Sequence, residues 1–191
     1  MSEGLYLVLS GPAGVGKDTV AKLLGGWISV SATTRPERPG DVEGETYFFH
    51  DRKTFERMIH EDELLEYAEY NGNYYGTPAT PARLHYERGD TVIFVIEVVG
   101  AAKVKARVPD AVTVFLVPPS FEVLRARLEG RRTESAEEVE KRLEIARREI
   151  EIGRRDYDYV VVNDRLEDAV DEIKHIIESE KEKRHAVSDF E

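Results

Sequence analysis

Two patterns of apolar and polar residues alternate along this chain and predict its elements. Short apolar runs, some of them strictly alternating, predict strands of a largely buried sheet at 5–9, 27–32, 91–100, 111–118 and 156–164. Apolar residues at helical spacing predict helices at 19–24, 52–61, 80–88, 101–107, 121–128, 136–154 and 166–183. Because strands and helices alternate, we predict a three-layer α/β fold with a central five-stranded parallel sheet.

The segment after the second predicted strand has a different pattern. Residues 31–47 are dense in Pro, Gly and charge, which favours a loop, and they lead into a short strand at 46–49. After the helix at 52–61, two β-prone runs flank Asn71-Gly72, which is a strong hairpin signal. At the other end of the chain, we expect residues 184–191 to form a mobile tail.

The composition excludes several classes of protein. A chain of 191 residues with 41% hydrophobic residues suits one domain with a real core, and it has no cysteine for a disulfide or a thiolate metal site. No apolar run approaches the ~20 residues that span a bilayer, and the N-terminus lacks the basic start of a signal peptide, so we expect a cytoplasmic protein. The net charge of −11 argues against nucleic-acid and acidic-membrane partners. The five histidines show no metal-ligand spacing, and both a monomer and a homodimer stay open.

The first apolar run leads directly into a glycine-rich loop, a lysine and a helix, which is the order of a P-loop. Glycines let backbone N–H groups surround a phosphate, the helix N-terminus adds partial positive charge, and Lys17 adds a full charge for the β- and γ-phosphates. A tight turn with a surface lysine is the alternative. The predicted ATP-binding residues are Gly11, Pro12, Ala13, Gly14, Val15, Gly16, Lys17, Asp18 and Thr19.

The residue after Lys17 departs from the P-loop motif, which has Ser or Thr there to bind Mg²⁺. Here it is Asp18, followed by Thr19. Three interpretations are open: Asp18 holds the metal or its waters, Thr19 supplies its hydroxyl one residue later, or Mg²⁺ sits mainly on the nucleotide phosphates. Since a carboxylate repels phosphates unless a cation lies between them, we favour an Asp18 that is linked to the metal or paired with Lys17.

Two arginines lie three residues apart in the loop at 31–47. Arg35 and Arg38 are flanked by prolines and suit a clamp for a phosphate, with solvated loop charges as the alternative. Here the chain resembles the guanylate kinases. The run Ser-Ala-Thr-Thr-Arg-Pro-Glu-Arg-Pro-Gly-Asp-Val at 31–42 is similar to their GMP-binding signature, and Glu-Leu-Leu-Glu-Tyr-Ala at 63–68 with Gly-Asn-Tyr-Tyr-Gly-Thr at 72–77 is similar to a second motif. The resemblance covers about residues 5–183.

The resemblance implies which side chains bind GMP: Arg35, Arg38, Tyr47 and Tyr75 at the phosphate, and Ser31, Glu66 and Thr77 at the base. The chemistry of Glu66 supports its role independently. Guanine presents two adjacent donors, N1–H and the 2-amino group, which one carboxylate can accept and which adenine lacks. Hydroxyls such as those of Ser31 and Thr77 can donate to guanine O6. The alternative is that Glu66 is a surface acid on a strand and that the tyrosines serve only in packing.

The family usually has Asp-[Ile/Val]-Asp-x-Gln-Gly at the end of the strand predicted at 91–100. This chain has Val95, Glu97 and Val99 in place of the two acids and the glutamine. Glu97 can serve with a longer arm, at the carboxyl end of a strand where open α/β sheets place their sites, so we include it among the GMP-binding residues. The Val95 side chain can neither donate nor accept a hydrogen bond.

The resemblance also implies a three-part kinase with a core at about 1–34, 87–128 and 149–183, a mixed α+β GMP-binding lobe at about 35–86, and a helical lid at about 129–148. The lid motif is matched by Arg131 and Arg142, which it would bring to the transferring phosphate, although Arg132 replaces the usual glycine. The predicted catalytic residues are Lys17, Arg131 and Arg142.

We therefore predict an enzyme that phosphorylates GMP to GDP, with ATP and GMP as small-molecule substrates and Mg²⁺ as cofactor. Ribose 1,5-bisphosphate kinases are one alternative, because they resemble this family and can carry Gly-Lys-Asp at the P-loop, but they do not need the two GMP motifs. A silent guanylate-kinase-like module that binds phosphopeptides is another. Asp18, Val95 and Val99 favour that module, and the intact Lys17 loop argues against it.

Overall fold

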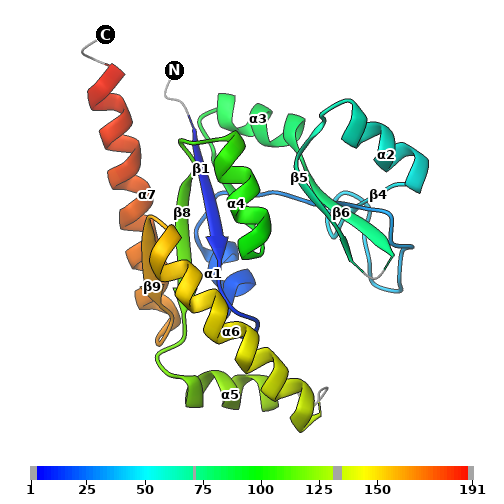
Figure 1. Cartoon of the computed structure of the whole chain (residues 1–191). Helices are drawn as coiled ribbons and strands as arrows, with labels where there is room; N and C mark the ends of the chain where they lie inside the picture. Colours follow the sequence, from blue (N-terminus) through cyan, green and yellow to red (C-terminus); the bar gives the residue numbers. More distant parts are fainter. Residues whose placement is uncertain (1–3, 71, 131–134, 189–191) are drawn as a thin grey trace.

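Five parallel strands form the central sheet of the computed structural model, which describes residues 4–70, 72–130 and 135–188 (Figure 1). The strands lie in the order β2-β7-β1-β8-β9. Their bounds are β1 Leu5–Ser10, β2 Trp27–Ile28, β7 Thr91–Val95, β8 Val112–Val117 and β9 Tyr159–Val162. All four pairings between neighbours are parallel, so the predicted five-stranded parallel sheet is confirmed.

Helices cover both faces of this sheet because side chains alternate along its strands. The covering helices are α1 Lys17–Leu23, α3 Ala79–Glu87, α4 Val98–Arg107 and α7 Leu166–Ser188. On β1, Leu7 packs in a core with α1 and α7, whereas its neighbour Val8 packs in a second core with α3 and α4. The result is the predicted three-layer arrangement.

A second sheet of four strands forms a lobe beside the first (right side of Figure 1). Its strands lie in the order β4-β3-β6-β5. The elements are β3 Ala32–Thr33, β4 Phe48–Phe49, α2 Arg52–His60, β5 Leu64–Tyr70 and β6 Asn73–Pro78. The predicted antiparallel hairpin of β5 and β6 is confirmed. The buried side chains of Phe55 and Met58 pack α2 against this sheet.

Two further helices, α5 Phe121–Glu129 and α6 Ala136–Asp156, lie on the opposite side of the molecule from α2 (Figure 1). Ser120 caps α5, because its Oγ accepts a hydrogen bond from the Val123 amide. Ser135 begins α6 in a capping box with Glu138. None of the helices in the described ranges is both long and apolar enough to cross a membrane.

Gly153 lets α6 cross β8 at very short range. A Cβ at this position would lie 2.3 Å from Cγ of the buried Phe115 ring. We expect Gly153→Ala to lower the free energy of unfolding by about 1–3 kcal/mol, because a fully packed ring must move to admit one methyl group. Urea denaturation checks this. Glu151→Ala, on the exposed side of the same helix, is the matched control and should change stability by less than about 0.5 kcal/mol; a Gly153→Ala protein as stable as the original contradicts the packing argument.

One predicted strand is wrong: residues 27–32 are not a single strand. β2 ends at Ile28 in the central sheet, and β3 begins at Ala32 in the second sheet. The chain therefore passes from one sheet to the other within the predicted run. Alternation of apolar residues continues through the crossing, so the pattern gives no sign of it.

The strand predicted at 91–100 is too long. β7 ends at Val95 and α4 begins at Val98, three residues before its predicted start. Val98 and Val99 extend the apolar run, but Val99 is 63% exposed and lies in the first turn of the helix. β-branched residues carry a preference for strands that tertiary packing overrides here.

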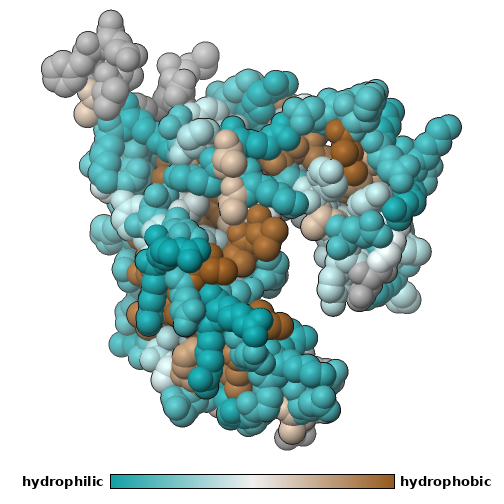
Figure 2. Space-filling model, in the orientation of Figure 1, coloured by the Kyte–Doolittle hydropathy of each residue, from teal (hydrophilic) through white to brown (hydrophobic). Residues whose placement is uncertain are grey.

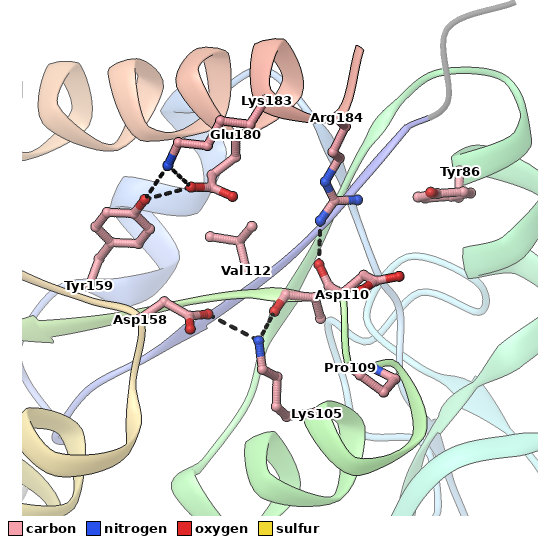
Figure 3. A pocket seen from close by; sticks show the side chains of 11 residues that line it. Tyr86, Lys105, Pro109, Asp110, Val112, Asp158, Tyr159, Glu180, Lys183 and Arg184 are labelled. Atoms are coloured by element: carbon pink, nitrogen blue, oxygen red, sulfur yellow. Dashed lines mark hydrogen bonds and ion pairs between the residues drawn. The ribbon is translucent and has the colours of Figure 1, made fainter. Parts of the chain in front are cut away.

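Residues 184–188 of the predicted tail continue helix α7, which therefore extends past its predicted end at residue 183. The end of α7 is tied to the rest of the molecule (Figure 3). The Arg184 guanidinium donates to the Asp110 carbonyl, and Lys183 donates to Glu180, which also accepts from the Tyr159 hydroxyl at 2.6 Å. Residues 189–191 lie outside the described part of the chain.

Candidate active site

The glycine-rich loop joins the carboxyl end of β1 to the N-terminus of α1 and forms one wall of a cavity of about 320 Å³. Gly16 begins α1 with φ 98°, a left-handed conformation that favours glycine, and a Cβ there would lie 2.8 Å from Asn163 Nδ2. The loop amides and the positive end of α1 thus face one small space. This geometry suits the phosphates of a nucleotide, as the sequence motif predicted.

Three polar side chains of the loop and the first turn of α1 line this cavity: Lys17, Asp18 and Thr19. The Lys17 ammonium donates to the Gly11 carbonyl at 2.6 Å and lies 3.5 Å from the Pro12 carbonyl. It is therefore held over the loop, within reach of a phosphate bound there. Asp18 and Thr19 are both exposed in the cavity, so the structure keeps both interpretations of the metal ligand open.

Two residues that the sequence analysis did not assign position the glycine-rich loop, Asn163 directly and Arg127 through Asn163. The buried Asn163, which follows β9, donates from Nδ2 to the Val15 carbonyl at 2.8 Å. Arg127 of α5 donates to the Asn163 carbonyl at 3.0 Å. The Val-Asn-Asp run after the last strand was visible in the sequence, but only the fold shows that it contacts the loop.

A second cavity of about 500 Å³ opens between the two sheets, lined among others by Ser31, Tyr47, Glu66, Tyr75 and Glu97. Tyr47 and Tyr75 meet edge to face with their ring centroids 6.0 Å apart. The structure thus brings together side chains that the sequence placed at both ends of GMP.

Arg35 is buried beside the aromatic end of this second cavity. Its guanidinium lies 5.2 Å from the Tyr47 ring centroid and pairs with Asp41 at 2.9 Å. Asp41 also accepts from the Arg38 amide at 2.7 Å, so one carboxylate orders the loop around both predicted arginines. The Arg38 side chain itself is exposed. Asp41 was not predicted as a site residue, although it stands in the signature that carries the resemblance.

Glu66 lies at the other end of the second cavity, on β5. Its Oε1 accepts from the hydroxyl of the buried Thr77 at 2.7 Å, so Thr77 orients the carboxylate and is not itself among the residues that line the cavity. Burial raises the pKa of Glu66 above its ordinary value, while the hydrogen bond from Thr77 and the Lys103 ammonium act in the opposite sense. A Cβ at Gly100 would lie 3.3 Å from Glu66 Oε2. Glu66 is therefore an oriented, half-buried acceptor, as a reader of guanine donors requires.

The two cavities share one wall, formed by Val95 at the end of β7 and by the next two residues, Ile96 and Glu97. The buried Ser10 hydroxyl at the end of β1 fixes this segment by donating to the Ile96 carbonyl at 2.7 Å. A phosphate on the glycine-rich loop and a molecule in the second cavity would therefore lie on either side of Glu97. This arrangement suits direct transfer of a phosphoryl group between two bound compounds.

Of the two predicted lid arginines, the structure describes only Arg142. Arg131 lies outside the described residues, and Arg142 is exposed on α6 and is not among the side chains that line either cavity. Figure 2 shows a deep hollow between the part of the surface formed by α5 and α6 and the part formed by the second sheet.

The fold also forms a cavity of about 670 Å³ at the amino ends of β8 and β9, opposite the glycine-rich loop (Figure 3). The lysine and arginine side chains that line it interact with other groups of the protein. Lys105, for example, donates to the Ala111 carbonyl at 2.6 Å and pairs with Asp158 at 3.2 Å. Open α/β sheets bind their ligands at the other, carboxyl end of the strands, and the contacts here stabilise the end of α7.

The described residues contain no cluster of three or more His, Cys, Asp or Glu side chains arranged to hold a metal ion. Mg²⁺ does not need such a cluster, because it is usually bound through one or two protein oxygens together with substrate phosphates. Asp18 and Thr19 offer such oxygens beside the loop. The site therefore fits an Mg²⁺ ion that arrives with a nucleotide.

Comparison with known proteins gives consistent matches. The sequence model of the guanylate kinase family matches residues 4–180. The guanylate kinase of Halalkalibacterium halodurans is 52% identical and covers 95% of this chain and 91% of its own length, and that of Lactococcus lactis is 52% identical over 93% and 89%. The crystal structure of guanylate kinase from Anaplasma phagocytophilum superposes with a TM-score of 0.72 at 38% identity, over 94% of this chain and 87% of that one.

Proposed function

The chain belongs to the guanylate kinase family, whose members are ATP-dependent kinases that phosphorylate GMP to GDP, and we propose how its residues divide this reaction. ATP places its phosphates on the glycine-rich loop at Lys17. GMP occupies the second cavity, with its base at Glu66 and its phosphate at Arg35, Tyr47 and Tyr75. The observation that carries the proposal is the shared wall at Glu97, which brings the two cavities together.

Phosphoryl transfer to GMP depends more on the alignment of the two substrates than on acid–base catalysis. The acceptor is already a phosphate oxyanion, so no strong general base is needed, and the rate comes from positioning and from stabilising charge on the transferring group. Lys17 and the loop amides stabilise the donor phosphates. Arg131 and Arg142 would add positive charge when the hollow beside α6 narrows. Narrowing also excludes water, which otherwise competes as an acceptor.

Mg²⁺ is the proposed cofactor, held by the ATP phosphates and by Asp18 or Thr19. It neutralises phosphate charge and orients the phosphates, and it also removes the repulsion between Asp18 and the nucleotide. We further propose that the second sheet is the GMP-binding lobe and the region around α6 the lid. The enzyme is proposed to act in the cytoplasm on ATP and GMP without a nucleic-acid partner, as a monomer or a homodimer.

Arg35 provides a test of where the acceptor phosphate binds. Arg35→Met should weaken GMP binding by about 10- to 100-fold, the worth of a charge-assisted hydrogen bond, and should leave the binding of guanosine, which has no phosphate, within about 2-fold of the original protein. Calorimetry with both ligands measures this. Arg83→Met, which removes an exposed arginine of α3, is the matched control. Equal losses for GMP and guanosine in Arg35→Met contradict the assignment.

A further inference from the structure

Glu149 is a buried acid that the account so far does not use. It lies on α6, is only 9% exposed, and occupies the inward-facing side of the helix between Ala146 and Gly153. Gly153 locks this part of α6 onto β8 through the close contact with Phe115. A carboxyl group is seldom buried unless it has partners, so we expect Glu149 to interact with other polar groups.

The partner of Glu149 is Glu97. The residues that follow them, Val98 at the start of α4 and Ile150 on α6, pack in the same buried cluster, and the two carboxyl groups interact with each other. Glu97 occupies the N-cap position of α4, but its side chain makes no capping hydrogen bond, so it is not used to begin its own helix. It lines both cavities instead. The other ionisable groups that face this pair are the Lys17 ammonium, from the glycine-rich loop, and the buried Tyr157 hydroxyl, from the end of α6.

Two carboxyl groups in contact are stable together only when they share a proton. Burial and then the neighbouring Glu97 raise the pKa of Glu149 to about 7, while Lys17 acts in the opposite sense. Glu149 thus holds a proton as the pH falls below about 7, and its O–H is then the donor to Glu97. When Glu149 loses this proton, the two carboxylates repel each other and Glu97 loses its fixed position.

We propose that Glu149 is a positioning residue for phosphoryl transfer, which donates a hydrogen bond to Glu97 and holds that carboxylate at the boundary between the ATP and GMP cavities. The proposal rests on the proposed placement of the two substrates. It also gives a reason for the longer side chain at position 97, because a glutamate can extend to the boundary while its carboxyl group stays in contact with α6. The helix that carries Arg142 is thereby connected to the wall shared by both substrates.

Two variants of Glu149 separate this role from simple packing. Glu149→Gln keeps a donor for Glu97, so its kcat should stay within about 3-fold of the original value. Glu149→Leu removes the donor and should lower kcat by about 10- to 100-fold. Its KM for each substrate should stay within about 3-fold of the original value. Glu151→Gln, an exposed acid on the same helix, is the control. Thermal denaturation confirms that each variant is folded, and the original enzyme in the same assay reports GMP phosphorylation independently.

The pH dependence supplies a readout that packing alone does not move. In the original enzyme, kcat/KM for ATP should fall as the pH rises through about 7, because the free enzyme then loses the shared proton. In Glu149→Gln this fall in kcat/KM should be absent. Titration of the substrate phosphates affects both proteins equally, so the difference between the two pH profiles reports Glu149. Identical profiles for the two proteins, or equal losses of kcat in Glu149→Gln and Glu149→Leu, overturn the proposal.

A double-variant cycle keeps the test valid if Glu149→Leu proves unstable. In the original protein, the milder Glu149→Ala change should lower kcat by at least 10-fold. In the Glu97→Gln protein, the same change should lower kcat by less than about 3-fold, because Glu149 acts through Glu97. Equal costs in both backgrounds contradict the proposed route, whether or not the enzyme phosphorylates GMP well.

Discussion

Replacing Lys17 by methionine is expected to lower kcat for GMP phosphorylation by about 10²–10³-fold, the usual loss when one preorganised charge donor is removed from a transferring group. Lys17 is the one side chain of the glycine-rich loop that carries a positive charge, and its ammonium is already held over the loop by the Gly11 carbonyl. Methionine keeps most of the aliphatic stem, so that the loop and α1 stay packed. Steady-state kinetics at saturating ATP and GMP measures the effect.

The control for this experiment is Lys22→Met, which removes an exposed lysine in the last turn of the same helix. It changes the net charge equally and should leave kcat within about 2-fold. A Lys17→Met enzyme with kcat close to the original would mean that the donor phosphates do not lie on this loop. The loss should appear in kcat more than in the KM for GMP, since Lys17 does not line the acceptor cavity.

Glu66→Gln is expected to remove most of the preference for GMP over AMP. We expect kcat/KM for GMP to fall by about 10²–10³-fold and that for AMP to stay within about 3-fold. The reason is that one carboxylate accepts both guanine donors, whereas a glutamine presents an N–H to one of them and leaves a buried donor unpaired. The contact from Thr77 to Glu66 Oε1 holds the group in place for this role.

The selectivity is measured as the ratio of kcat/KM for the two nucleotides in each protein. Glu63→Gln, a charge-matched change at the start of the same hairpin that affects a surface pair with Arg57, should leave the ratio unchanged. If Glu66→Gln lowers the two values in parallel, the residue supports the fold of the cavity and does not read the base.

Apolar patterns predicted the central sheet because its inner strands, β1, β7 and β8, are largely buried on both faces and because turn residues flank the strands. They failed where the physical cause lies outside the segment. Nothing local marks the point between Ile28 and Ala32 where the chain leaves one sheet for the other. Val98 and Val99 were assigned to a strand because their preference is weak compared with the packing of α4. The end of α7 depends on contacts with Asp110 and Tyr159, far away in the chain.

The candidate site shows the same division. Lys17, Arg35 and Glu66 were assigned from short motifs, because the spacing of a motif indicates its chemistry, and the structure places them at the glycine-rich loop and around the second cavity. Residues that act through remote contacts were not assigned. Asn163 reaches the glycine-rich loop across 148 positions of sequence, and Glu149 reads as part of a charged helix until the fold places it against Glu97. Both are visible only when the burial of a polar side chain is known.

The measurement that tests the central claim most directly is the formation of ADP from ATP with Mg²⁺ and a panel of acceptors: GMP, AMP, UMP and ribose 1,5-bisphosphate. The account predicts turnover with GMP that exceeds turnover with every other acceptor, because Glu66 and the arginine loop together recognise guanine and phosphate. Folded protein that binds GMP but forms no ADP with any acceptor, or that prefers ribose 1,5-bisphosphate, would contradict the account.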